Sequence, residues 1–138
     1  MEIAQRMGVL ISCKMTPDRT EAPYEINTTW WRALNGDGDA ESLDVKVRRY
    51  LASRSIGLVI PGVPGIHIHG ALGSSNDYRA VEASGVKRDV NRSVIDVRDV
   101  EAALEDPASR ISLLRTHGTA IFFLETSGEI IARWVTFN

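Results

Sequence analysis

The stretch from Pro61 to Arg92 constrains the fold of this chain more than any other segment. It opens with a tight Pro/Gly turn, after which Gly65–His69 alternates apolar and polar residues and predicts a short strand. The polar, Gly-rich residues that follow, up to Arg92, indicate a long loop. Such loops are uncommon in compact domains and are usually functional or disordered. Because barrel enzymes place substrate contacts on loops that follow core strands, the stretch predicts a substrate-contacting loop.

The composition indicates one ordinary globular domain. At 138 residues the chain can bury a core, and its 43% hydrophobic and 25% charged residues are typical of soluble proteins. The formal net charge of -2 gives no electrostatic case for binding nucleic acid or an anionic membrane. We therefore expect neither nucleic acid nor a membrane as a partner.

Cysteine usage and hydropathy predict a cytoplasmic location. Cys13 is the single cysteine, so the chain has no disulfide framework and a reducing compartment is expected. No apolar run approaches the roughly 18 residues that a membrane span requires. The polar start of the sequence does not have the pattern of a signal peptide.

The first half of the chain is expected to form strands and helices in βαβ order. The apolar run Gly8–Cys13 predicts a buried strand, and Asn27 is expected to cap a short helix that runs through Leu34. Residues 43–59 have apolar side chains at helical spacing and predict the main helix. With a second strand at 65–69, this order predicts a parallel sheet.

The second half is expected to be helical and then to end in a hairpin. Residues 96–104 predict a helix capped by the first of them, and 106–114 predict a second helical piece. Residues 119–124 and 130–135 are β-rich runs with a turn between them, which predicts an antiparallel hairpin. The composition shift near Gly118 is the one plausible domain boundary.

Three groups of motifs, in this order and spacing, resemble the sucrose phosphorylase branch of the α-amylase superfamily (glycoside hydrolase family 13). The motifs are Gly8–Lys14 with Tyr24–Asn27, Arg49–Ser53 with Pro61–Ile66, and Gly73–Asp77 with Arg88–Arg92. The resemblance spans roughly residues 5–107 and is lost after Pro107. It implies an α/β fold in which residues 1–117 form the last strands and helices of a (β/α)8 barrel. Residues 118–138 would then be a β-hairpin, either at the start of a C-terminal β domain or as a divergent or frameshifted end.

The resemblance also implies a reaction. Enzymes of this branch are retaining, so one carboxylate attacks the anomeric carbon and a second protonates the leaving oxygen, about 5–5.5 Å away. Phosphate then replaces water as the acceptor and releases glucose 1-phosphate. In the family the nucleophile, the acid/base and a stabilising Asp all lie on strands that precede the segment begun by Met1. We therefore expect no catalytic residue in this chain.

Three residues are candidates for substrate binding. Arg92 matches the family arginine that reaches into the glucosyl subsite and pairs with an Asp from an early strand. A planar guanidinium suits that role because it holds carboxylates and hydroxyls in fixed geometry. Tyr24 and Lys14 would border the acceptor side. Asn91, with Asp89, either contacts sugar or shapes the loop, and the second interpretation is favoured.

Other chemistry-bearing residues favour structural interpretations. The acidic cluster Asp37, Asp39, Glu41 and Asp44 lacks the ligand spacing of a calcium loop and predicts a solvated turn. His67 and His69 lack a third ligand at metal-site spacing, and Trp30 and Trp31 have the placement of helical core residues. No metal and no cofactor are expected.

Two hypotheses for function remain open. In the first, the chain is part of an α-glucoside phosphorylase, its partners are an α-glucoside and phosphate, and it is inactive without the rest of the barrel, which needs about 250 residues. In the second, it is a non-catalytic carbohydrate-binding or interaction module derived from the half-barrel. An unrelated hydrolase has no support, since no Gly-x-Ser-x-Gly motif is present. Sucrose, sucrose 6-phosphate and glucosylglycerate are all donors within this branch.

Overall fold

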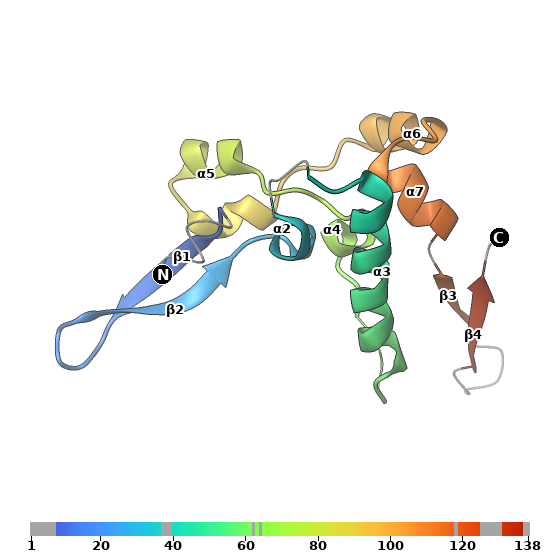
Figure 1. The fold of residues 1–138 in the computed structure, drawn as a ribbon. Helices are drawn as coiled ribbons and strands as arrows, with labels where there is room; N and C mark the ends of the chain where they lie inside the picture. The colour runs from blue at the N-terminus through green and yellow to red at the C-terminus, as the bar shows by residue number, and fades with distance from the viewer. Residues whose placement is uncertain are drawn as a thin grey trace. The chain divides into compact units, whose positions relative to one another are not determined.

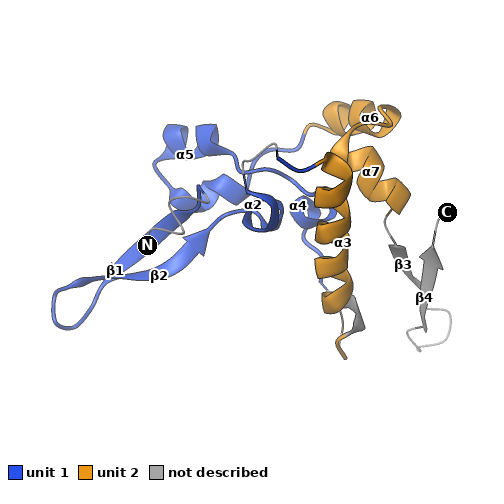
Figure 2. Cartoon of the chain, viewed as in Figure 1, with its two compact units in different colours: residues 1–41, 65–95 blue, residues 42–64, 96–138 orange. Residues whose placement is uncertain are grey.

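The computed structural model describes residues 8–36, 40–61, 63, 65–117, 119–124 and 131–136. It is an α/β chain (Figure 1), whose elements are β1 Leu10–Met15, β2 Glu21–Asn27, α2 Trp30–Asn35, α3 Leu43–Val59, α4 Ile68–Ala71, α5 Tyr78–Ser84, the 3-10 helix η1 Lys87–Asn91, α6 Val97–Glu105, α7 Arg110–His117, β3 Thr119–Leu124 and β4 Ile131–Thr136. The chain divides into two compact units, residues 1–41 with 65–95 and residues 42–64 with 96–138 (Figure 2).

The first unit is built on an antiparallel hairpin. β1 pairs with β2 from Leu10 opposite Asn27 to Met15 opposite Glu21. The register shifts after Ser12, so that Tyr24 has no opposite residue and forms a β-bulge. The predicted parallel pairing of residues 8–13 with 65–69 is wrong, because residues 65–67 form no strand and β1 pairs instead with β2. The chain turns back within a few residues after Met15, and so short a connection permits only antiparallel pairing. Among the described residues, both sheets are antiparallel pairs.

The start of α2 differs from the sequence-based expectation. Asn27 is the last residue of β2, and Thr29 is the N-cap, whose Oγ1 accepts a hydrogen bond from the backbone N–H of Arg32 at 3.3 Å. Asn27 instead donates its amide to the hairpin. The Asn27 prediction was wrong because both residue types are good caps and the helical pattern alone does not choose between them.

The stretch that follows α3 contains helices where a strand and a loop were expected. Residues 65–67 have no regular structure, and α4 begins at Ile68. Ile66 and Ile68 are 52% and 53% exposed, and none of the described strands pairs with this segment. The segment expected to be a loop contains α5, capped by Asp77 and ended by Gly85 in the left-handed region, and then η1.

The second unit agrees closely with the helix predictions. α3 has the predicted bounds, with Ser42 as its N-cap, and α6 is capped by Asp96 as expected. α7 begins at Arg110 rather than at Asp106, because residues 106–109 form a turn. α7 packs against both α3 and α6. Val47, Tyr50 and Leu114 are the buried apolar residues there.

The predicted C-terminal hairpin is confirmed in its pairing. β3 and β4 are antiparallel, with Thr119 opposite Thr136 and Leu124 opposite Ile131. The expected turn at 126–129 lies outside the described residues. In the part of the chain that the structure describes, no helix has both the length and the apolar character needed to cross a bilayer.

Helix α3 offers a matched pair of valines that tests its buried face. Val47 is 0% exposed, whereas Val45, two residues earlier, is 44% exposed. We expect Val47→Ala to lower the free energy of unfolding by about 2 kcal/mol, because it removes buried methyl groups and leaves a cavity. Val45→Ala should change it by less than about 0.5 kcal/mol. Urea unfolding followed by circular dichroism measures both; equal losses would contradict the packing of α3.

Two glycines of the first unit test how tightly residue 8 is enclosed. Gly8 has φ +62°, and a Cβ there would lie 2.4 Å from Nη2 of the buried Arg32 and 2.9 Å from the Tyr78 hydroxyl. Gly85 has a similar φ of +71° but open space around it. Both alanine substitutions carry the left-handed penalty of about 1 kcal/mol. We expect Gly8→Ala to cost at least about 1 kcal/mol more through overpacking. Thermal unfolding of the two variants provides the comparison.

Candidate functional site

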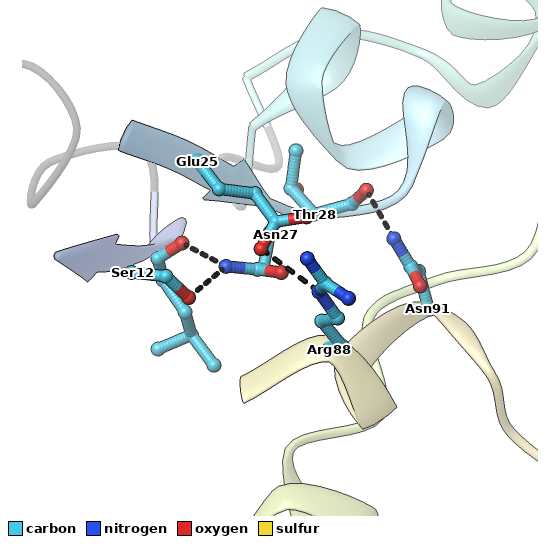
Figure 3. A network of polar contacts seen from close by, with 7 residues as sticks. Ser12, Glu25, Asn27, Thr28, Arg88 and Asn91 are labelled. Carbon is cyan, nitrogen blue, oxygen red and sulfur yellow. Dashed lines mark hydrogen bonds and ion pairs between the residues drawn. The ribbon is translucent and has the colours of Figure 1, made fainter. Parts of the chain in front are cut away.

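A network of polar contacts attaches η1 to the β1–β2 hairpin of the first unit (Figure 3). Lys87 Nζ donates to the backbone carbonyl of Ile11 at 2.6 Å. Arg88 Nε donates to Glu25 Oε2 at 2.9 Å (Figure 3). Asn91 Nδ2 donates to the backbone carbonyl of Thr28 at 3.3 Å. A 3-10 helix has three residues per turn, so Arg88 and Asn91 lie on the same side of η1. That side faces β2 and the residue that follows it.

Two further asparagines fix the segments around η1. Asn27 donates to Ser12 Oγ at 2.8 Å and to the Leu10 carbonyl at 3.3 Å, across the hairpin. Asn76 Oδ1 accepts from the backbone N–H of Thr29 at 2.7 Å and from Thr28 Oγ1 at 3.3 Å. The start of α2 is therefore held by side chains that come from far along the sequence.

The apolar support beneath these bonds is Val90. It lies within η1 and is 0% exposed. Its backbone carbonyl accepts from the N–H of Asp77 at 2.8 Å, which joins η1 to the cap of α5. The Tyr78 hydroxyl donates to the carbonyl of Gly8, so α5 is also tied to the start of the hairpin. A buried side chain and bonds to three segments leave η1 little freedom.

The structure places the three predicted binding residues around this network. Arg92 is exposed and directly follows η1, with its backbone N–H bonded to the Asp89 carbonyl at 3.1 Å. Tyr24 is half exposed on β2, and Lys14 Nζ lies 6.0 Å from its ring centre. Asn91 is partly buried, and its amide donates to Thr28, which agrees with a loop-shaping role. Substrate contacts by these residues stay a prediction.

Arg88 also lies in this region, and the sequence analysis predicted no separate role for it. Its pKa is raised, first by the hydrogen bond to Glu25, then by the charge of that carboxylate, and further by Tyr24. Its guanidinium therefore stays charged next to both side chains. Arg88 and Asn91 are three positions apart in the Arg88–Arg92 motif. This spacing predicts that the two residues lie on the same side only if the segment is taken to be a 3-10 helix.

The candidate metal ligands do not form a cluster. Among the described residues, no group of three or more His, Cys, Asp or Glu side chains is suitably placed. The ring centres of His67 and His69 are 5.1 Å apart, and His69 Nδ1 lies 3.1 Å from Ser74 Oγ. Asp44 pairs with Arg48 at 2.8 Å, and Asp37 and Asp39 lie outside the described residues.

The two tryptophans of α2 differ in their surroundings. Trp31 is 7% exposed, in agreement with the expected core position, whereas Trp30 is 49% exposed and is not a core residue. The helix is too short for adjacent positions to be told apart from spacing alone. Trp30 therefore has an aromatic face open to solvent.

Adjacent substitutions at the end of η1 separate a structural residue from an exposed one. Asn91→Ala removes a partly buried hydrogen bond to the Thr28 carbonyl, and we expect it to lower the free energy of unfolding by about 1 kcal/mol. Arg92→Ala truncates an exposed side chain and should change it by less than about 0.5 kcal/mol. Chemical denaturation measures both variants. A larger loss for Arg92→Ala would contradict this assignment.

Comparison with known proteins reveals relatives among glucoside phosphorylases. No family model matches the chain. A glucosylglycerate phosphorylase of Escherichia coli is 37% identical over 109 residues, which are 79% of this chain and 19% of that protein. One from Allomeiothermus silvanus is 39% identical over 103 residues, 75% of this chain and 18% of that protein. A sucrose phosphorylase of Agrobacterium vitis is 31% identical over 120 residues, 80% of this chain and 23% of that protein.

A solved structure supports the same assignment at the level of the fold. The sucrose 6F-phosphate phosphorylase of Thermoanaerobacter thermosaccharolyticum superimposes with a TM-score of 0.59 at 24% identity, over 91% of this chain and 26% of that one. The chain thus spans about a fifth of the length of the curated relatives it matches. The matched residues of this chain belong to the sucrose phosphorylase-like branch of the α-amylase superfamily, glycoside hydrolase family 13.

Proposed function

We propose that this chain is part of a retaining α-glucoside phosphorylase. Residues 1–117 would belong to the C-terminal part of its (β/α)8 barrel, and residues 118–138 would be a β-hairpin at the start of a following β domain. The observation that carries the proposal is the match of one continuous segment, 103–116 residues long, to three glucosylglycerate phosphorylases at 36–39% identity. A barrel of eight strands needs about 250 residues, so the activity would require more barrel than these residues supply.

The proposed reaction transfers a glucosyl group from an α-glucoside to phosphate. A carboxylate attacks the anomeric carbon as the glycosidic oxygen leaves with a proton from the acid/base, and phosphate then displaces the carboxylate. Glucose 1-phosphate and the freed aglycone are the products. Both carboxylates would come from parts of the enzyme that this sequence does not include.

This chain would contribute binding groups to the reaction. Arg92 would contact the glucosyl unit, since it is exposed and its backbone is fixed at the end of η1. Tyr24 would border the acceptor side, and Asn91 would hold the η1 turn through Thr28. Relatives named glucosylglycerate phosphorylases are 36–39% identical to this chain, and those named sucrose phosphorylases 28–31%, which favours glucosylglycerate as the donor.

Complementation of a relative tests the proposal. The full chain is mixed with the Escherichia coli glucosylglycerate phosphorylase from which the matched segment has been removed, and glucose 1-phosphate formation from glucosylglycerate and phosphate is measured. We expect no product from either protein alone and product from the mixture. Arg92→Ala should lower the rate of the mixture about 10- to 100-fold, the effect of losing hydrogen bonds to a charged group. Arg98→Ala, on exposed α6, is the matched control.

Two outcomes would contradict the proposal. Product formation by the pure chain would mean that it carries its own catalytic groups. Saturable binding of glucose or glucosylglycerate to the chain, with no activity in the mixture, would favour the alternative of a non-catalytic carbohydrate-binding module. Isothermal titration calorimetry on the chain alone distinguishes that case from a chain that does not bind sugar.

A further inference from the structure

Tyr24 is the bulged residue of β2, so pairing with β1 does not fix its position. Ser12 lies opposite Glu25 and Cys13 opposite Pro23, so no residue of β1 stands directly opposite Tyr24. An extra residue of this kind is aimed by its surroundings rather than by the ladder. The position of Tyr24 is therefore influenced by Lys14 Nζ, 6.0 Å from its ring centre, and by the contacts of its neighbour Glu25.

Arg88 supplies the contact across from this bulge. Its Nε donates to Glu25 Oε2 at 2.9 Å, and Figure 3 shows the guanidinium reaching from η1 to β2. Glu25 directly follows Tyr24 in β2, so Arg88 is bonded to the residue that adjoins the bulged position.

The same 3-10 helix sets the position of Arg92. The backbone N–H of Arg92 bonds to the Asp89 carbonyl, one residue after Arg88, so the two arginines are separated by a single 3-10 turn. The Arg88–Glu25 pair therefore acts on the same 3-10 helix that ends at Arg92.

The exposure of this pair argues against a role in stability. The side chains of Arg88 and Glu25 are 48% and 29% exposed, and exposed ion pairs contribute little to folding because both groups are well solvated. Lys87 and Asn91, which donate to backbone carbonyls, already attach η1 to the hairpin. The Arg88–Glu25 pair therefore orients η1 relative to β2, whereas Lys87 and Asn91 attach η1 to the hairpin.

We propose that Arg88 is a positioning residue, which aligns Tyr24 on β2 with Arg92 after η1 by pairing with Glu25. Its meaning for sugar binding rests on the proposed function, whereas the alignment itself is a property of this chain. A lysine at position 88 would keep the charge and lose the rigid fork of the guanidinium, so it should restore the alignment in part.

The alignment is tested on the full chain by NMR. The sequence has three tyrosines, and Tyr50 and Tyr78 serve as internal references for the ring signals of Tyr24. We expect Arg88→Gln and Glu25→Gln to shift or broaden the Tyr24 ring signals and to raise amide exchange at Arg92 about 2- to 5-fold. The double variant should add nothing to either single one, because both remove the same pair.

Controls separate alignment from general destabilisation. The Thr29 amide, held by Asn76, and the midpoint of unfolding should be unchanged in Arg88→Gln, and Arg88→Lys should lie between Gln and the natural residue. Arg98→Gln removes another exposed arginine–carboxylate pair and should leave Tyr24 and Arg92 unaffected. Unchanged Tyr24 signals in Arg88→Gln, or equal changes at Thr29, would overturn the proposal.

Kinetics in the complemented enzyme give an independent readout. We expect Arg88→Gln to raise KM for glucosylglycerate about tenfold with kcat within about twofold, since misaligned binding groups weaken ground-state binding. A purely structural residue would reduce the active fraction and leave KM unchanged, which would contradict positioning. If the natural chain does not restore activity at all, the proposed function fails, and the NMR measurements still decide the role of Arg88.

Discussion

The hydrogen bonds between η1 and the β1–β2 hairpin are the constraint on which the first unit depends. A two-stranded hairpin is marginal alone in water, and a single 3-10 turn has no stability of its own. Lys87 and Asn91 donate to backbone carbonyls on β1 and just after β2, and the side chain of Val90, which lies in η1, is completely buried. The two weak elements therefore support one another.

Local signals predicted the second unit well and the first unit poorly. Ser42 and Asp96 are caps followed by long helical patterns, so α3 and α6 could be predicted from residues within a few positions of one another. Short apolar runs such as residues 65–69 fit a strand or a helix equally, and only a neighbouring strand would decide. No such neighbour pairs with Ile66 or Ile68, both half exposed, and the segment becomes irregular and then helical.

The resemblance pointed to Arg92, Tyr24 and Asn91 as binding residues, which stays a prediction. The contacts around them could not be predicted, because Asn91 bonds to Thr28 and Arg88 bonds to Glu25 across 63 positions of the sequence. Periodicity carries no information about contacts at that separation. Arg88 and Asn91 share a side only because η1 has three residues per turn, which the sequence presented as part of a loop.

These connections show that the region around η1 is organised by contacts within one part of the chain. The polar bonds around η1 all join residues of one compact unit, so they need nothing from the remainder of a barrel to form. Catalytic carboxylates act only when placed across the sugar from one another, which demands a closed barrel. The proposed binding groups Arg92 and Tyr24 would need only a fixed mutual position, which the proposed role of Arg88 would supply within the chain. Binding geometry can therefore be tested here separately from catalysis.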